Sequence, residues 1–312
     1  MRYVIMGTGG VGGFFGAKLA SSGEDVWFVA RGKHLDAMKN HGLNVKSTDG
    51  SFTISPEKVT GDAASIGVAD VVLFCVKSYD TEVAARQISS FLNDDSIVLS
   101  VQNGVDNVDK IQRELHHGFA YGGAAYLSAR ITAPGEITET GGFQRIVFGP
   151  TSGPVTSRAR DIHASFLKAG IKCDLHDNIN RELWRKLIFI ASMGALTALS
   201  RLTHGEILSD PRMLQLTFDA MREIQGIAWK LGIDVEPVDE AKILEGLKRF
   251  DPNTRSSMFF DLVSGKPMEV EALNGTVVRF GEQLGLPTPI HRVIYASLLP
   301  HHLKHMQQRT PI

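Results

Sequence analysis

Short apolar runs alternate with amphipathic stretches throughout the N-terminal half of the chain. The apolar runs predict buried strands over residues 3–6, 25–30, 70–76 and 96–101. They have almost no polar interruption, which is typical of parallel strands covered on both faces. The stretches between them predict helices over residues 10–22, 33–40 and 81–92. This alternation favours an α/β fold with a doubly wound, mostly parallel sheet.

The pattern changes towards the middle of the chain. The remaining elements of the first half are, in order, a strand over 120–133, a strand over 136–148, a helix over 157–168 and a strand over 171–175. Pro134-Gly135 is the turn signal between the two strands. From residue 178 onward, helical periodicity dominates. We therefore predict two domains, an α/β domain over residues 1–176 and a mainly α-helical domain over residues 177–312.

The composition is that of a globular protein with two sizeable cores, since 43% of the 312 residues are hydrophobic and 21% are charged. The net charge of −1 gives no indication of a nucleic-acid or anionic-membrane partner. No apolar run reaches the roughly 20 residues needed to cross a bilayer. The first predicted strand begins directly after Met1, which leaves no room for a signal peptide. We expect a cytoplasmic protein.

A glycine-rich loop follows the first predicted strand and opens the first predicted helix. Its residues fit the G-x-G-x-x-G pattern: Gly7, Thr8, Gly9, Gly10, Val11 and Gly12. In that pattern the first glycine permits a tight turn, the second lets the backbone approach a pyrophosphate, and the third lets helix and strand pack closely. The helix N-terminus then offers N–H groups to the anion. This context favours a Rossmann dinucleotide-binding site over a glycine turn without a ligand.

The end of the second predicted strand indicates which dinucleotide is bound. NAD sites place Asp or Glu there for the ribose 2′-hydroxyl, whereas NADP sites place Arg. This strand ends with Ala30-Arg31-Gly32-Lys33. The Arg31 guanidinium suits a 2′-phosphate, and Lys33 adds a second positive charge. We predict NADP(H) as the cofactor, and the alternative is a solvated basic loop.

Several sequence blocks stand in a fixed order along nearly the whole chain. They are the glycine loop, Val76-Lys77, Gln102-Asn103-Gly104, the R-E-L-W-R-K-L run over 181–187, Ser256-Ser257-Met258 and the E-V-E-A-L-N-G run over 269–275. Together they resemble the blocks of ketopantoate reductases (2-dehydropantoate 2-reductases). The resemblance implies a Rossmann domain followed by a helical domain, with substrate in the cleft between them. It also implies reduction of a 2-oxo acid by NADPH, with ketopantoate converted to pantoate in pantothenate biosynthesis.

The resemblance assigns two catalytic roles. Hydride delivery to a ketone leaves an alkoxide, so the site needs a proton donor and a positive charge near that oxygen. Lys186 matches the family's catalytic lysine, which fills this role. Glu269 matches the family's glutamate, which hydrogen-bonds the reacting oxygen or hydroxyl. A partly desolvated cleft would lower the pKa of Lys186 from its ordinary value of about 10.4 towards neutrality.

Four more positions match residues that contact substrate or cofactor in the family. Ser257 corresponds to the serine that holds the substrate carboxylate. Asn103 corresponds to the asparagine between nicotinamide and substrate, and Lys77 to a cleft lysine near the cofactor. Asn274, in the last block, is a further candidate for substrate binding.

These residues also have ordinary structural interpretations. The alternatives are a surface ion pair between Glu182 and Lys186, a solvated carboxylate at Glu269 or Glu271, helix caps at Ser256 and Ser257, and a turn at Asn274-Gly275. The agreement of several blocks favours the functional interpretation for Lys186, Glu269, Ser257 and Asn103.

Two positions depart from the family's pattern. Ketopantoate reductases usually carry an asparagine one helical turn after the lysine, and many carry another four residues further on, both facing substrate. Here those positions are Ile190 and Gly194. Each polar group of ketopantoate left buried without a partner would cost about 1 to 3 kcal/mol. The departure suggests, as a hypothesis, a different or less polar 2-oxo acid.

Other function classes fit the sequence less well. A sensor that binds NADPH without turnover has no use for a proton donor at the nicotinamide, so Lys186, Glu269 and Ser257 together favour an enzyme. A dehydrogenase of larger 3-hydroxy acids would carry glycine-rich substrate motifs that are not evident. The histidines at 301, 302 and 305 lack a completing carboxylate, so we predict a solvated terminal helix and no metal site. The long apolar helices of the second half are compatible with a homodimer.

Overall fold

The chain folds into two compact units, and a computed structural model describes residues 1–309 of it. The first unit comprises Met1–Gln102 and Asn107–Ile179. The second comprises Asn103–Asp106 together with the described residues from 180 to 309. Among the described residues, every strand belongs to the first unit, and the second is helical. This confirms the predicted fold class, an α/β unit with a mostly parallel sheet followed by a mainly helical one.

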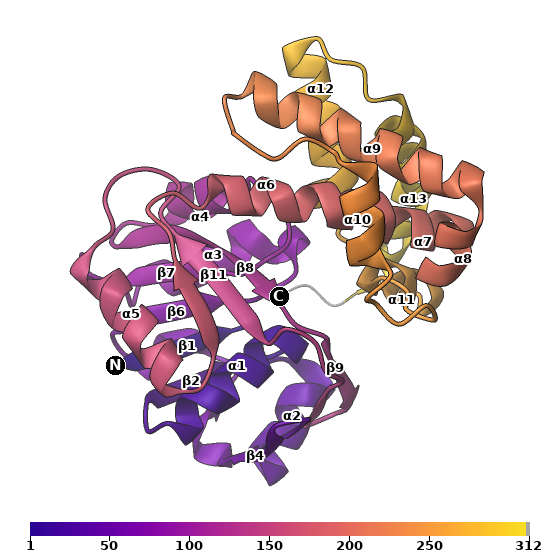
Figure 1. Cartoon of the computed structure of the whole chain (residues 1–312). Coiled ribbons are helices and arrows are strands. Elements are labelled where there is room, and N and C mark those ends of the chain that lie inside the picture. The colour runs from indigo at the N-terminus through magenta and orange to yellow at the C-terminus, as the bar shows by residue number, and fades with distance from the viewer. Residues whose placement is uncertain (310–312) are drawn as a thin grey trace. The chain divides into compact units, whose positions relative to one another are not determined.

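An eight-stranded sheet forms the centre of the first unit (Figure 1). Its strands, in spatial order, are β12 (Lys172–Leu175), β11 (Arg145–Gly149), β8 (Phe119–Tyr126), β7 (Ile97–Ser100), β6 (Val71–Phe74), β1 (Arg2–Met6), β2 (Asp25–Val29) and β5 (Val59–Thr60). Neighbouring strands are parallel except β8 and β11. From β1 the chain continues to β2 on one side and later to β6 on the other. The strand order therefore reverses at β1, and ligands of doubly wound sheets bind at the carboxyl ends of strands at such a point.

Helices cover both faces of the large sheet. They are α1 (Gly10–Ser21), α2 (Gly32–His41), α3 (Thr81–Ser89), α4 (Asn107–Glu114) and α5 (Ser157–Lys168), with the short 3₁₀ turns η1 (Pro56–Lys58), η2 (Ala63–Ile66) and η3 (Ser78–Asp80). On one face, Phe14 and Phe15 of α1 and Phe166 of α5 are buried in one apolar core. On the other face, Ile88 of α3 and Ile111 of α4 belong to a second core. Alternate residues of β1 enter the two cores, as the pleat of a doubly covered strand requires.

A second, four-stranded sheet in the first unit corrects the sequence prediction. Its order is β4 (Gly50–Ile54), β3 (Leu43–Ser47), β10 (Glu136–Glu139) and β9 (Ala129–Ala133). The single strands predicted over 120–133 and 136–148 are wrong, because each of these stretches holds two strands that belong to different sheets. Helix α1 contacts strands of both sheets, and it is buried from Gly12 to Leu19. A helix that is apolar on all sides must be covered on all sides, so the small sheet packs on the face of α1 that the large sheet does not cover.

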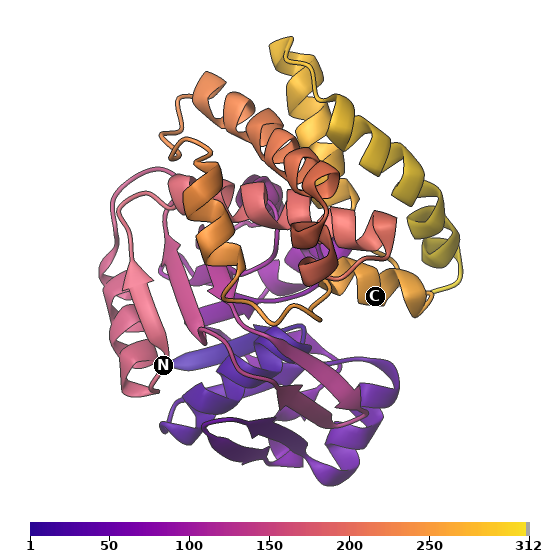
Figure 2. The ribbon, with the colours of Figure 1, turned by 45° about the vertical axis from the view of Figure 1, so that its right-hand side comes forward.

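The second unit consists of helices around one apolar core. They are α6 (Asn180–Phe189), η4 (Ile190–Gly194), α7 (Ala195–Ser200), α8 (His204–Ser209), α9 (Pro211–Lys230), α10 (Glu240–Leu247), α11 (Ser257–Val263), η5 (Glu271–Gly275), α12 (Thr276–Leu284) and α13 (Pro289–Gln307). The long helices α9 and α13 lie side by side (Figures 1 and 2). The segments η4 and η5 are π-helical and run directly into α7 and α12. Such π segments are rare and occur frequently at functional sites.

The continuous helical stretch Asn180–Ser200 is long and apolar enough, by length and composition alone, to cross a membrane. From the sequence we predict no apolar run long enough to cross a bilayer, and this stretch is an exception. In the structure, 56% of its apolar window is buried inside the protein. Leu187, Ala191 and Leu196 of this stretch belong to the core of the second unit. This burial is that of a core helix.

Candidate functional site

The glycine loop leaves open space in front of helix α1. Gly7 has a φ of +100°, a conformation that favours glycine. A Cβ at Gly12 would lie 2.4 Å from the Gly7 carbonyl oxygen, so a larger residue would push the helix away from β1. A Cβ at Gly9, in contrast, would meet nothing within 4 Å. The amides of Gly10 and Val11 open the helix, where no preceding turn supplies acceptors. This cradle fits the pyrophosphate of a dinucleotide.

The loop is tied to the end of β2, where the first basic side chain stands. Thr8 donates from its amide and its hydroxyl to the Val29 carbonyl oxygen, at 3.0 and 2.9 Å. Arg31 follows β2; its side chain is 54% exposed, and its Nη2 lies 3.0 Å from Oδ2 of Asp80. Lys77 is half-buried and follows β6. Because β2 and β6 flank β1, Arg31 and Lys77 stand at strand ends on either side of the glycine loop.

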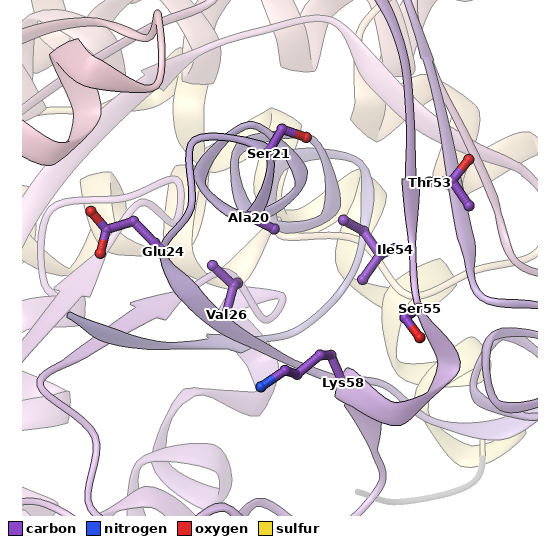
Figure 3. Close-up of a pocket in the computed structure, with 8 residues that line it drawn as sticks. All are labelled: Ala20, Ser21, Glu24, Val26, Thr53, Ile54, Ser55 and Lys58. Atoms are coloured by element: carbon purple, nitrogen blue, oxygen red, sulfur yellow. The ribbon is translucent and has the colours of Figure 1, made fainter.

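A pocket of about 240 Å³ opens at the other end of α1 (Figure 3). It is lined by Ala20, Ser21, Glu24, Val26, Thr53, Ile54, Ser55 and Lys58. Ala20 and Ser21 end the helix that the glycine loop begins, and about 15 Å of helix at 1.5 Å per residue separates the two places. Glu24 is paired with the N-terminal amine at 2.6 Å, and Lys58 with Asp25 at 2.8 Å. This pocket is therefore distinct from the dinucleotide cradle.

Three of the predicted site residues gather in the second unit. Lys186 lies on α6 and is half-buried. Glu269, just before η5, is 7% exposed. Asn103 belongs to the short segment that joins this unit, and its Nδ2 lies 3.4 Å from Oε2 of Glu269. The charge of Glu269 also acts on Lys186. The three side chains thus combine a cation, a carboxylate and an amide.

The surroundings of Lys186 lower its pKa to about 8. Burial is the largest cause, because it disfavours the charged ammonium. The carboxylates of Glu269 and Glu182 oppose this effect by stabilising the ammonium. The amine therefore holds a proton at neutral pH and releases it readily, as a proton donor must.

Ser257 is the first residue of α11, and its side chain is exposed. The preceding Ser256 is the cap of this helix: its hydroxyl accepts from the Phe259 amide at 3.1 Å and donates to the Gly194 carbonyl oxygen at 2.7 Å. The Thr197 hydroxyl lies 2.8 Å from that of Ser256. These bonds hold the start of α11, and with it Ser257, against the end of η4. Helix capping is the alternative role that the sequence suggests for Ser256 and Ser257. In the structure Ser256 caps the helix and Ser257 does not.

The two departures from the family pattern bound the first π-helical segment. Ile190 is the first residue of η4 and Gly194 is the last, and both are partly exposed. A Cβ at Gly194 would make an ordinary contact of 3.5 Å with the Ser256 Cβ. Glycine is therefore not required at this position for packing, and its effect is to leave space beside the start of α11.

Asn274 joins the two π-helical segments inside the core. Its side chain is fully buried, and its Nδ2 lies 2.9 Å from the Ala191 carbonyl oxygen and 3.0 Å from Nδ1 of His291. Burial lowers the pKa of His291 to about 4, so this imidazole is neutral and its Nδ1 accepts the bond. The amide thus fastens η5 to η4, and substrate contact by Asn274 stays a prediction.

The candidate carboxylates of this unit, Glu182, Glu269 and Glu271, differ in their surroundings. Glu271 is partly exposed and binds the Tyr295 hydroxyl at 2.6 Å and Arg279 at 2.9 Å. Glu269 is buried beside Asn103 instead. Glu182 is 8% exposed and lies 3.4 Å from Arg185, so the description as a surface carboxylate does not fit it.

The C-terminal histidines do not form a solvated cluster, which corrects the sequence prediction. His302 is buried, and its Nδ1 accepts from the Met268 amide at 3.1 Å. Nδ1 of His305 lies 3.1 Å from the Lys266 carbonyl oxygen, and His301 is exposed. Within residues 1–309, no group of three or more His, Cys, Asp or Glu side chains could hold a metal ion.

Three features of these sites lie outside the sequence motifs. Asp80 pairs with Arg31, which lies 49 residues earlier in the chain. The sequence indicates Asp80 as a site residue only by its position three residues after Lys77. Thr197 follows Gly194 by three residues, the spacing of one helical turn. The segment 103–106 belongs to the helical unit although the residues on either side of it belong to the first unit. Its sequence carries no helical periodicity that could have predicted this.

Comparison with known proteins covers both units. The model of the family described as ketopantoate reductase PanE/ApbA matches residues 3–153, and that of its C-terminal domain matches residues 178–301. A 2-dehydropantoate 2-reductase of Mesorhizobium japonicum is 30% identical over 93% of this chain and 94% of its own. The crystal structure of a PanE/ApbA family ketopantoate reductase from Ralstonia eutropha JMP134 is 31% identical, with a TM-score of 0.89 over 98% of this chain and 100% of its own.

A third similar structure extends the comparison at the level of fold. It is a D-mandelate dehydrogenase solved with NADH and anilino(oxo)acetate. It is 20% identical, with a TM-score of 0.88 over 98% of this chain and 100% of its own. At this identity the likeness concerns the fold alone.

Proposed function

The chain belongs to the ketopantoate reductase family, and we propose that it reduces a 2-oxo acid to the 2-hydroxy acid with NADPH, with ketopantoate as the first candidate. It is a 2-dehydropantoate 2-reductase-like oxidoreductase. The observation that carries the proposal is Lys186, whose pKa is lowered to about 8 near the buried Glu269. A regulator that only binds the cofactor has no need of such a proton donor.

In this proposal the first unit holds the cofactor. The open space at Gly9 and the first-turn amides of α1 would receive the pyrophosphate. Arg31 would bind the 2′-phosphate through its exposed guanidinium edge, and Lys77 would add positive charge at the end of β6, on the other side of β1. A bound nicotinamide supplies the hydride.

The second unit supplies the acid chemistry. The Lys186 ammonium stabilises the alkoxide that forms on the substrate and gives it a proton from Nζ. Glu269 holds the ammonium form of Lys186 and accepts a hydrogen bond from the product hydroxyl. Asn103 is held by Glu269 and orients the reacting group. Ser257, exposed at the start of α11, donates to the substrate carboxylate.

The pH dependence of turnover should follow the titration of Lys186. Reduction requires the ammonium, so kcat for reduction should be level below about pH 8 and fall above it. Oxidation of the hydroxy acid requires the neutral amine, so its kcat should rise through the same range. Both profiles are measured at saturating substrates. Two profiles that turn in the same direction would contradict the role of Lys186.

The proposal is tested by following NADPH absorbance in purified protein mixed with ketopantoate. Turnover that yields pantoate supports the proposal in full. Tight NADPH binding without turnover of ketopantoate moves the test to a panel of other 2-oxo acids. Failure of the whole panel would instead favour the NADPH-sensing regulator.

A different, less polar 2-oxo acid is the second candidate, and Ile190 and Gly194 favour it. Both lie where the family usually carries amides that face substrate, and both are partly exposed in η4. The branched aliphatic side chain of Ile190 and the open space at Gly194 suit an apolar substituent better than the hydroxyl of ketopantoate.

Replacing Ile190 by asparagine should raise kcat/KM for ketopantoate by about 5- to 150-fold, since a restored hydrogen bond to a buried polar group is worth about 1 to 3 kcal/mol. Steady-state kinetics with NADPH measure the effect. Ile190→Leu, which keeps an apolar side chain of the same size, is the matched control and should show no gain. An unchanged or lower kcat/KM in Ile190→Asn would count against a substrate role for this position.

A further inference from the structure

Asp80 is a buried carboxylate whose partner stands at the dinucleotide cradle. Its side chain is 1% exposed, and its Oδ2 lies 3.0 Å from Nη2 of Arg31, whose own side chain is 54% exposed. Asp80 precedes the first residue of α3, a position where aspartate normally accepts from the helix amides. Here the side chain makes no capping bond. Its carboxylate is turned to Arg31 instead.

The geometry leaves most of the guanidinium available to a ligand. A guanidinium has five N–H donors in a rigid plane, and a single one of its nitrogens, Nη2, lies against Asp80 in this pair. The carboxylate is buried while the guanidinium is largely exposed, so Asp80 holds the inner edge of Arg31 and the outer edge faces solvent. A long, flexible side chain is thereby restrained to one region before any ligand arrives, which reduces the entropy lost on binding.

The negative charge of Asp80 is itself held in place. It lies at the N-terminus of α3, whose partial positive charge favours a carboxylate. Its backbone amide donates to the Lys77 carbonyl oxygen at 2.9 Å, which fixes the turn that carries it. The charge of the Asp80 carboxylate is therefore not stabilised by Arg31 alone. The Arg31 guanidinium can interact with a second anion, such as a phosphate, at the same time.

We propose that Asp80 is a positioning residue that sets the preference for a 2′-phosphorylated dinucleotide by holding Arg31 in place. This rests on the proposed use of NADPH. Asp80 touches neither the reacting atoms nor the phosphate, and its effect passes through the guanidinium. Its removal should therefore weaken binding of NADPH and leave binding of NADH, which lacks the 2′-phosphate, almost as it was.

The test measures the Kd of NADPH and of NADH by nucleotide fluorescence, so it does not depend on turnover of any substrate. Asp80→Asn should raise the Kd for NADPH at least tenfold and that for NADH less than threefold. Glu82→Gln is the matched control, because Glu82 is an exposed carboxylate in the first turn of the same helix. It should leave both Kd values within twofold of the unmodified protein.

A double-mutant cycle with Arg31→Ala separates positioning from a general effect on structure. If Asp80 acts through Arg31, adding Asp80→Asn to Arg31→Ala should change the NADPH-to-NADH ratio no further. An equal loss for both nucleotides in Asp80→Asn would overturn the inference and show a structural role. Tighter NADPH binding would also overturn it, because the carboxylate would then compete with the phosphate.

The same data distinguish a failure of this inference from a failure of the proposed choice of cofactor. Unmodified protein that prefers NADPH, combined with an unchanged ratio in Asp80→Asn, would refute the role of Asp80 and leave NADPH in place. Unmodified protein with no preference for NADPH would refute the choice of cofactor, and the inference with it.

Discussion

Lys186→Ala should lower kcat for reduction by about 10²- to 10⁴-fold, the range that a positioned proton donor typically contributes. The alkoxide would lose both its proton source and the nearby positive charge. The Kd for NADPH should change little, because the residues proposed to bind its phosphates belong to the first unit. Stopped-flow and steady-state measurements with the best 2-oxo acid, together with direct NADPH titration, would separate the two effects.

Arg181→Ala is the matched control for Lys186→Ala. It removes one positive charge from the same helix, but from an exposed side chain paired with Glu236 at 3.0 Å. It should retain kcat within about twofold, as surface pairs contribute little. A fall in kcat of less than tenfold in Lys186→Ala, with the fold intact by circular dichroism, would remove Lys186 from the proposed mechanism.

Two glycines of the loop, Gly9 and Gly12, should respond in opposite ways to alanine. Gly9→Ala should keep the melting temperature and weaken dinucleotide binding about tenfold or more, because its Cβ would enter the open space proposed for the pyrophosphate. Gly12→Ala should instead destabilise the fold by about 1 to 3 kcal/mol, because its Cβ would lie 2.4 Å from the Gly7 carbonyl oxygen. Thermal unfolding and NADPH titration on both variants measure the contrast.

Gly226→Ala supplies the control for this comparison. Gly226 lies within α9, and a Cβ there would meet nothing within 4 Å. Alanine should raise the stability slightly, by about 0.5 to 1 kcal/mol, and leave binding unchanged. If Gly9→Ala bound the dinucleotide as well as the unmodified protein, the open space would not be a ligand site.

The large sheet could be predicted from the sequence because its central strands are continuous apolar runs. β1, β6 and β7 are buried at nearly every position, and their residues are almost all apolar. The small sheet could not be predicted in the same way. β3 and β4 mix exposed with buried residues, and β9 is mostly exposed. Their pairing depends on α1, which packs beneath them.

Residues of the candidate site that stand in a sequence motif could be predicted. Features that depend on how distant segments pack could not. Lys186 and Glu269 stand in blocks that the sequence displays, and the structure places them near one another. The π-helical form of η4 has no sequence signal, because Ile190 to Gly194 would fit an ordinary helix equally well. The pairing of Asp80 with Arg31 depends on how two strand ends meet, and periodicity carries no information about that.

The bond between Asn103 and Glu269 joins residues 166 positions apart in the chain. During synthesis on the ribosome, the sheet of the first unit has all its strands well before Glu269 is made. Asn103 must therefore emerge early and remain without Glu269 until more than half of the chain has followed. The site around Lys186 is then among the last parts of the molecule to be completed, and a nascent chain with a finished sheet is still unable to perform the proposed reaction.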